Sequence, residues 1–221
     1  MSTLDARAAS IRAQVADYRR AGRHVFATSS FQTYSVPLLH ILSKLEVPVP
    51  VYFLDTGYHF PETLRFRDEL AAAFDLRVVS VRPPVPKSYQ RDAAGRLLYA
   101  SDPEHCCHLN KVQPLEPVLA GHDVWISGVR ADQSRARAAM RREEVTPEGV
   151  RRYHPMLEWN ARDIYAYLRA HALPKHPLET AGYVSIGCEP CTRRHTTGER
   201  GGRWFGLQKS ECGLHTELIK S

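Results

Sequence analysis

The sequence lacks the long apolar segments that insert proteins into membranes. None of its apolar runs approaches the roughly 20 residues that a transmembrane helix needs. The N-terminal stretch MSTLDARAASIRAQVADYRR carries charged side chains throughout and contains no apolar signal region. Internal repeats, low-complexity tracts and a convincing linker are also missing, and the eleven histidines show no metal-ligand spacing. These absences predict a cytoplasmic protein without a membrane partner, folded as one domain over residues 1–221.

The basic side chains form no uninterrupted tract, although they outnumber the acidic ones. Thirty Lys and Arg residues against 24 Asp and Glu give a formal net charge of +6. The basic residues concentrate in segments 130–152 and 193–203, which also contain glycine and polar residues. An excess of positive charge favours an anionic partner. On composition alone, nucleic acid and a small, multiply charged ligand fit equally well.

Strand-like and helix-like segments alternate along the first 170 residues. We expect helices over 4–20, 36–45, 62–74 and 161–170, and strands over 24–27, 49–54, 76–81 and 123–127. This alternation predicts an α/β fold in which a parallel, twisted sheet is covered by helices on both faces. Beyond Pro174 the periodicity fades, and we expect a loop-rich C-terminal segment.

Polar side chains follow three of the predicted strands, at the point where each strand ends. They lie in the segments 28–35, 54–57 and 130–137. Ligands of parallel sheets bind beyond the carboxyl ends of the strands, and the N-terminus of a following helix favours an anion. Because Ser and Thr also cap helices routinely, the first segment alone leaves capping and anion binding equally open. The convergence of all three segments on one edge predicts a pocket for a small anion.

The five cysteines divide into two pairs and one single residue. Cys106 and Cys107 are adjacent, Cys188 and Cys191 form a Cys-Glu-Pro-Cys pair, and Cys212 stands alone. Paired cysteines in a reducing compartment bind metal or perform redox chemistry more often than they cross-link. Four thiolates suit tetrahedral zinc, but an adjacent pair fits an iron–sulfur cubane better, because each thiolate then binds a different iron. The spacing leaves both occupants open, with Cys212 as a separate candidate nucleophile.

These motifs resemble those of the sulfonucleotide reductases from about residue 24 to the end of the chain. The likeness is carried by Phe-Leu-Asp-Thr-Gly at 53–57, Ser-Gly-Val-Arg at 127–130, the motif around the Cys pair at 182–193, and Glu-Cys-Gly-Leu-His at 211–215. Cys106-Cys107 followed by Lys111 also fits. The two cysteine pairs together resemble the iron–sulfur type, the assimilatory adenylyl-sulfate reductases of bacteria and plants.

The resemblance implies both a fold and a reaction. The fold would be that of the PP-loop ATP pyrophosphatases, the adenine nucleotide alpha hydrolase-like class. Segment 29–35 contains no Ser-Gly-Gly-x-Asp-Ser, so ATP cleavage is not expected. The reaction would be the thioredoxin-dependent reduction of adenosine 5'-phosphosulfate to sulfite and AMP, in sulfate assimilation and cysteine biosynthesis. The alternative substrate is 3'-phosphoadenosine 5'-phosphosulfate, although relatives committed to it generally lack the four paired cysteines.

The resemblance also implies roles for individual residues. Cys106, Cys107, Cys188 and Cys191 would hold a [4Fe–4S] cluster, and Cys212 would attack the sulfate sulfur to form an S-sulfocysteine. Residues 204–221 would form a mobile tail that carries this nucleophile. The substrate-binding residues would be Ser29, Ser30, Phe31, Gln32, Ser35, Leu54, Asp55, Thr56, Gly57, Lys111, Gly128, Arg130, Arg137, Arg200 and Arg203.

Partners follow from the same resemblance. Thioredoxin would be the electron donor, nucleic acid is not expected, and homo-oligomer formation is left open. A competing, non-catalytic interpretation is a basic metal-binding module that recognises nucleic acid. It predicts bound zinc and a binding activity that does not depend on Cys212.

Overall fold

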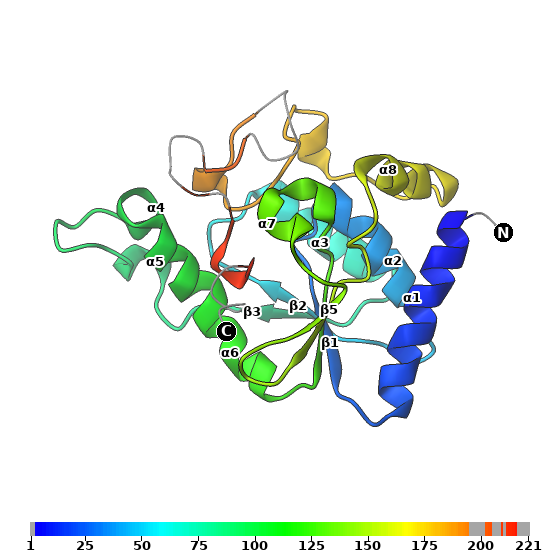
Figure 1. Cartoon of the computed structure of the whole chain (residues 1–221). Coiled ribbons are helices and arrows are strands. Elements are labelled where there is room, and N and C mark those ends of the chain that lie inside the picture. The colour runs from blue at the N-terminus through cyan, green and yellow to red at the C-terminus, as the bar shows by residue number, and fades with distance from the viewer. Residues whose placement is uncertain (1–2, 195–201, 205–208, 210, 216–221) are drawn as a thin grey trace.

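A six-stranded sheet forms the centre of the molecule. The computed structural model describes residues 3–194, 202–204, 209 and 211–215 (Figure 1). The strand order is β3-β2-β1-β4-β6-β5. The strands are β1 (Val25–Thr28), β2 (Val51–Leu54), β3 (Val78–Val81), β4 (Val124–Ser127), β5 (Glu143–Val145) and β6 (Arg151–Tyr153). All neighbouring strands are parallel except β5 and β6, so the predicted parallel sheet is confirmed with one antiparallel edge strand that the sequence did not predict.

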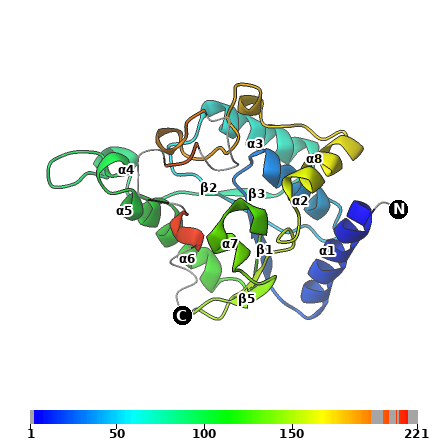
Figure 2. The same cartoon turned by 45° about the horizontal axis from the view of Figure 1, so that its top comes forward.

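Helices cover both faces of the sheet, as expected from the sequence. The longer ones are α1 (Thr3–Arg20), α2 (Val36–Ser43), α3 (Pro61–Ala73), α6 (Gln113–Ala120) and α8 (Ala161–Ala170). Alternate strand residues point to opposite faces. Figure 2 shows α2, α3 and α8 on one side of the central strands and α6 on the other. Ala27 of β1 packs in the core with α1, α2, α3 and α8, whereas its neighbour Phe26 packs against α6. The chain therefore builds two apolar layers of unequal size, one on each side of the sheet.

Short helical segments connect the main elements. They are α4 (Leu98–Ser101), α5 (Pro103–Cys107), a π-helical turn η3 (His108–Val112) and α7 (Arg135–Ala138). The 3-10 turns are η1 (Thr33–Ser35), η2 (Lys87–Tyr89), η4 (Ala131–Gln133), η5 (Pro177–Glu179), η6 (Glu189–Cys191) and η7 (Gly213–His215). Because α5, η3 and α6 follow one another without a break, the Cys106-Cys107 pair lies on one long helical segment from Pro103 to Ala120.

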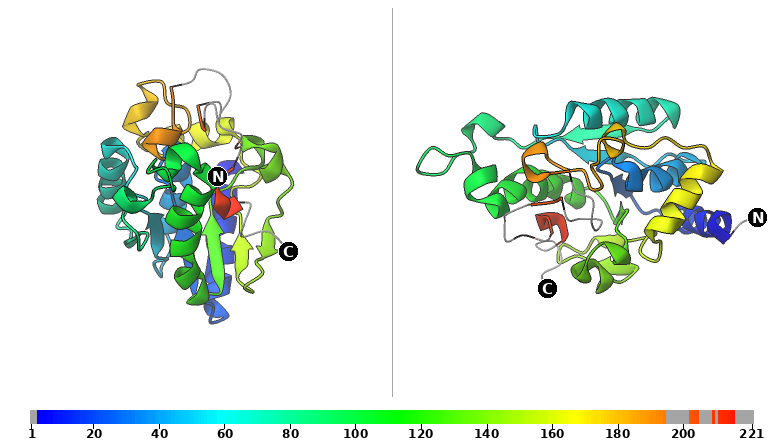
Figure 3. Two further views of the ribbon diagram at one scale, coloured as in Figure 1. Left: turned by 90° about the vertical axis from the view of Figure 1, so that its left-hand side faces the viewer. Right: turned by 90° about the horizontal axis from the view of Figure 1, so that it is seen from above.

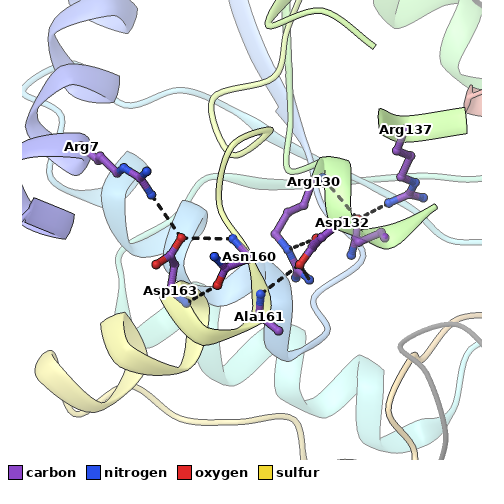
Figure 4. Close-up of polar contacts among 8 residues, drawn as sticks. Arg7, Arg130, Asp132, Arg137, Asn160, Ala161 and Asp163 are labelled. Atoms are coloured by element: carbon purple, nitrogen blue, oxygen red, sulfur yellow. Dashed lines mark hydrogen bonds and ion pairs between the residues drawn. The ribbon is translucent and has the colours of Figure 1, made fainter. Parts of the chain in front are cut away.

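Hydrogen bonds and ion pairs join the start of α8 to α1 and to the segment after β4 (Figure 4). Asn160 caps α8 by accepting a hydrogen bond from the Asp163 N–H at 3.0 Å, and Asp163 also pairs with Arg7 of α1 at 3.1 Å. The Asp132 carboxylate accepts the Ala161 N–H at 3.0 Å and pairs with Arg130 at 2.9 Å. The segment after β4 is thereby attached to the start of α8.

The C-terminal third crosses the carboxyl edge of the sheet (Figure 3). Beyond α8 the described residues contain only 3-10 turns and loops, as the fading periodicity predicted. Most of the expected mobile tail, 204–221, lies outside the described residues, so its mobility and the single-domain boundary stay predictions. Among the helices that the structure describes, none is both long and apolar enough to cross a membrane.

Candidate active site

A cavity of about 170 Å³ opens where the carboxyl ends of β1 and β4 meet. These two strands are neighbours in the sheet. After β1 the chain adds β2 and β3 on one side of β1, and it then crosses over to add β4 on the other side. This is the topological switch point at which parallel sheets bind ligands. The wall includes Ser29 from the turn after β1, Gly128 from the turn after β4, and Gly187 from the C-terminal third.

The turn after β1 supplies most of the polar wall. Ser29, Ser30, Gln32 and Ser35 line the cavity; their role in substrate binding stays a prediction. Phe31 does not line it, because its ring is fully buried and packs against Phe53 with the ring centroids 5.7 Å apart. The φ of Phe31 is +52°, a left-handed value that a bulky residue adopts only when its surroundings compensate. The anchored ring holds the turn so that its hydroxyl groups face the cavity.

The turn after β2 contributes less to the cavity than predicted. Leu54 lines it, but Asp55, Thr56 and Gly57 do not. Asp55 accepts the Gly57 N–H at 3.2 Å and pairs with Arg82 at 2.9 Å. Burial alone would raise the pKa of Asp55, but these two hydrogen bonds lower it below its ordinary value. The carboxylate therefore stabilises the turn and does not face the ligand space.

The four paired cysteines line one small pocket beside the cavity. Cys106 and Cys107 come from α5, whereas Cys188 directly precedes the single turn η6 and Cys191 is its last residue. All four are buried and none forms a disulfide. Burial, together with the three neighbouring thiols, raises the pKa of Cys106 to about 12. Four buried thiols facing one another suit an electron-poor group such as a cluster of irons, which holds cysteines as thiolates.

The occupant of this pocket is constrained by how the sulfurs are arranged. In the part of the chain that the structure describes, no group of three or more His, Cys, Asp or Glu side chains is arranged to hold a single metal ion. The four thiols nevertheless line one pocket, so the choice between zinc and a cluster depends on the chemistry of the adjacent Cys106-Cys107 pair. Thr56, which the sequence assigned to the substrate, instead lies in this pocket with its hydroxyl 3.3 Å from Cys188 Sγ.

Lys111 connects the cysteine pocket with the cavity, because its side chain lines both. It lies in the π-helical turn η3, and such turns occur frequently at functional sites. Burial would lower the pKa of Lys111, but the negative charges of the Cys188, Cys107 and Cys212 thiolates raise it above its ordinary value. Lys111 is therefore a fixed positive charge. Cys212 also lines the cavity, so the predicted nucleophile and this ammonium group share one space.

The four arginines predicted to bind the substrate differ in their positions relative to the cavity. Arg203 lines the cavity, lies 4.5 Å from the Trp204 ring, and makes no ion pair with any residue that the structure describes. Arg137 lines the cavity but is paired with Glu211. Arg130 does not line it; the side chain is buried and pairs with Asp132 (Figure 4). Its guanidinium also lies over the Tyr34 ring, 4.4 Å from the centroid. Arg200 lies outside the described residues.

Several wall residues were not predicted from the sequence. They include His59, Trp125, Ile186, Trp204 and Leu214. Most are apolar or aromatic, and such residues cannot be distinguished from core residues by spacing alone. Ile186 and Gly187 could have been suspected from their place directly before Cys188.

The chain belongs to the phosphoadenosine phosphosulfate reductase domain family. Residues 24–194 match the model of that family, which covers most of the sequence. An adenosine 5'-phosphosulfate reductase from Streptomyces coelicolor is 41% identical over 203 residues, covering 88% of this chain and 83% of that protein. The adenosine 5'-phosphosulfate reductase of Mycobacterium tuberculosis is 40% identical over 182 residues, covering 80% and 71%.

Solved structures confirm the fold. Phosphoadenylyl-sulfate reductase from Candida auris, in a phosphate complex, matches with a TM-score of 0.67 and 24% identity, covering 86% of this chain and 96% of that one. FMN adenylyltransferase from Candida glabrata matches with a TM-score of 0.57 and 14% identity, covering 90% and 66%. At these identities the likeness concerns the fold alone, which is the predicted PP-loop, adenine nucleotide alpha hydrolase-like class.

Proposed function

We propose that the protein reduces adenosine 5'-phosphosulfate to sulfite and AMP in sulfate assimilation. The observation that carries this proposal is that Cys212, Lys111 and Arg203 line the same cavity. The cavity thus combines a thiol with two cationic groups, as a nucleophilic attack on an anionic sulfate requires. The relatives at about 40% identity, named as adenosine 5'-phosphosulfate reductases, support the choice of nucleotide.

The reaction follows from the side chains around the cavity. Arg203 and Lys111 bind the phosphosulfate, and their charges stabilise the phosphate of the departing AMP. The thiolate of Cys212 attacks the sulfate sulfur, and the bond from that sulfur to the bridging oxygen breaks, so AMP leaves with the electron pair. The product is an S-sulfocysteine. A thioredoxin thiolate then attacks Cys212 Sγ and releases sulfite, and the second thioredoxin thiol restores Cys212 and leaves a thioredoxin disulfide.

We further propose that Cys106, Cys107, Cys188 and Cys191 hold a [4Fe–4S] cluster. Their common pocket and their burial support it, as does the adjacency of Cys106 and Cys107, whose thiolates can bind different irons. When bound, the cluster would tune the electrostatics of the cavity without exchanging electrons, because a dithiol donor already supplies the two electrons of the reduction. Thioredoxin as donor implies a cytoplasmic protein, since that compartment keeps its thiols reduced.

Sulfite release from the two sulfonucleotides tests the proposal. With thioredoxin and its reductase present, we expect faster turnover of adenosine 5'-phosphosulfate than of the 3'-phosphorylated nucleotide. Without a dithiol, AMP should appear only up to one equivalent per enzyme and no sulfite should be released. Preferential turnover of the 3'-phosphorylated nucleotide would assign the chain to the alternative substrate. Failure to release sulfite from either would refute the proposed activity.

Gly187→Ala should weaken substrate binding through Arg203. A Cβ at Gly187 would overlap the guanidinium of Arg203, and this flexible group would have to leave its place on the cavity wall. Because a hydrogen bond to a charged group contributes about 1.5–3 kcal/mol, we expect KM for adenosine 5'-phosphosulfate to rise roughly tenfold or more. The melting temperature should hardly change, since the φ of Gly187 is not left-handed.

Gly121→Ala is the matched control for this variant. Gly121 follows α6, and a Cβ there would make only ordinary contacts at 3.8 Å. We expect neither KM nor the melting temperature to change in this control. If Gly187→Ala leaves KM unchanged as well, Arg203 does not bind the substrate from its observed position.

A further inference from the structure

Glu211, the residue directly before Cys212, is almost completely buried in a network of hydrogen bonds. Its side chain is 1% exposed. The carboxylate accepts hydrogen bonds from Arg137 Nε at 3.1 Å, from Arg137 Nη2 at 3.0 Å and from Ser134 Oγ at 2.6 Å. A bidentate arginine–carboxylate pair is directional as well as strong. The position and orientation of the Glu211 side chain are therefore strictly defined.

Ser134 and Arg137, which donate to Glu211, both belong to the segment that follows β4. Ser134 caps α7 by accepting the Arg137 N–H at 3.3 Å, and Arg137 Nη1 donates to Gln133 Oε1. The guanidinium thus has Nε, Nη1 and Nη2 engaged inside the protein, although its side chain borders the cavity. The turn forms a preorganised receptor for one carboxylate, and the sequence neighbour of Cys212 occupies it.

A second ion pair attaches the same segment to the cysteine helix. The side chain of Lys209 is 3% exposed, and its Nζ lies 2.5 Å from Oε2 of Glu104 in α5. The two ion pairs have opposite polarity and approach Cys212 from different elements, α5 and α7. Cys212 and Leu214, which follow Glu211 in the chain, line the cavity. Movement of Cys212 away from the cavity therefore has to break the buried pair of Glu211.

We propose that Glu211 is a positioning residue, which holds the thiol of Cys212 at the cavity through Arg137 and Ser134. In this arrangement Arg137 serves primarily to receive the Glu211 carboxylate. The role in turnover rests on the proposed function, whereas the docking of Cys212 does not. Removing the charge of Glu211 leaves Arg137 buried without its counter-ion, so the docked arrangement loses its main support.

The test compares Glu211→Gln with the wild-type protein by two independent measurements. The first is the rate at which iodoacetamide alkylates Cys212, followed by mass spectrometry of the Cys212 peptide. Because the undocked thiol is accessible, we expect alkylation to be about tenfold faster or more in the variant. The second is steady-state kinetics, in which kcat should fall while KM stays the same or decreases, since the freed Arg137 attracts the anionic substrate.

Controls separate positioning from general damage. Arg135→Ala removes an exposed arginine of the same helix and should change neither measurement. Glu211→Asp keeps the charge on a shorter side chain and should give intermediate values. The melting temperature shows whether Glu211→Gln is folded; if it is not, Ser134→Ala removes one donor and should accelerate alkylation less strongly.

Failure of the positioning role and failure of the proposed activity give different results. Equal alkylation rates in folded Glu211→Gln and in the wild type would overturn the proposal. If instead the wild type releases no sulfite from adenosine 5'-phosphosulfate, the proposed activity fails, but the alkylation rates still decide whether Glu211 docks Cys212.

Discussion

Cys212→Ser should abolish turnover while the variant still folds and binds AMP. A serine hydroxyl is a far weaker nucleophile than a thiolate and cannot form an S-sulfocysteine. Removal of the nucleophile from other enzymes that use covalent catalysis costs roughly 10⁴-fold or more in kcat. Cys212 is only partly buried, and serine is similar in size, so the packing around the cavity should survive. The loss therefore reports on chemistry and not on stability.

Two measurements check this result. Sulfite release is followed at saturating adenosine 5'-phosphosulfate with thioredoxin, and AMP binding is measured by calorimetry. Mass spectrometry after a single turnover without thioredoxin should show a sulfonate adduct on the wild-type protein and none on the variant. A variant that retained wild-type activity would rule out covalent attack by Cys212.

Cys191→Ser should lose iron and stability together. A [4Fe–4S] cluster needs four thiolates, and Cys191 is buried in the shared pocket. Because metal binding is coupled to folding, a variant with three ligands should lose both the cluster and the stabilisation that it provides. Iron and sulfide analysis after anaerobic purification should show the loss, together with weaker brown colour and a lower melting temperature.

Cys212→Ser is the matched control for the ligand variant. It removes a thiol from the same region but not from the cysteine pocket, so its iron content should equal that of the wild type. If Cys191→Ser keeps its full iron content, the assignment of ligands is wrong. Stoichiometric zinc in the wild-type protein would replace the cluster by a single-ion site and revive the metal-binding alternative.

The α/β architecture was predictable because it depends on local patterns. The predicted helix 62–74 corresponds to α3 at Pro61–Ala73, and the predicted strand 123–127 to β4 at Val124–Ser127. The hairpin of β5 and β6 was missed because each strand has only three residues and carries charged side chains. Such strands have no apolar periodicity, and they form only because β4 offers an edge on which β6 can pair.

Less of the candidate site than of the fold was predictable from the sequence. The pairing of cysteines in the sequence separated Cys212 from the other four, and the structure places those four around one pocket. The role of each arginine was less accessible, because it depends on partners. Arg130 has a carboxylate two positions along the chain, whereas Arg137 meets Glu211 across 74 positions. Only the second pair requires the complete fold.

Residue type and spacing by themselves determined that the chain forms a helix-covered parallel sheet, and that four cysteines are set apart from a fifth. These conclusions rest on side-chain periodicity and on thiol chemistry, which are local properties. Tertiary structure alone decided that Lys111 lines both pockets, that Arg130 does not line the cavity, and that Glu211 is buried beside Cys212. Burial and charge pairing arise from segments distant in sequence, and only the folded chain brings them within the few ångströms over which they act.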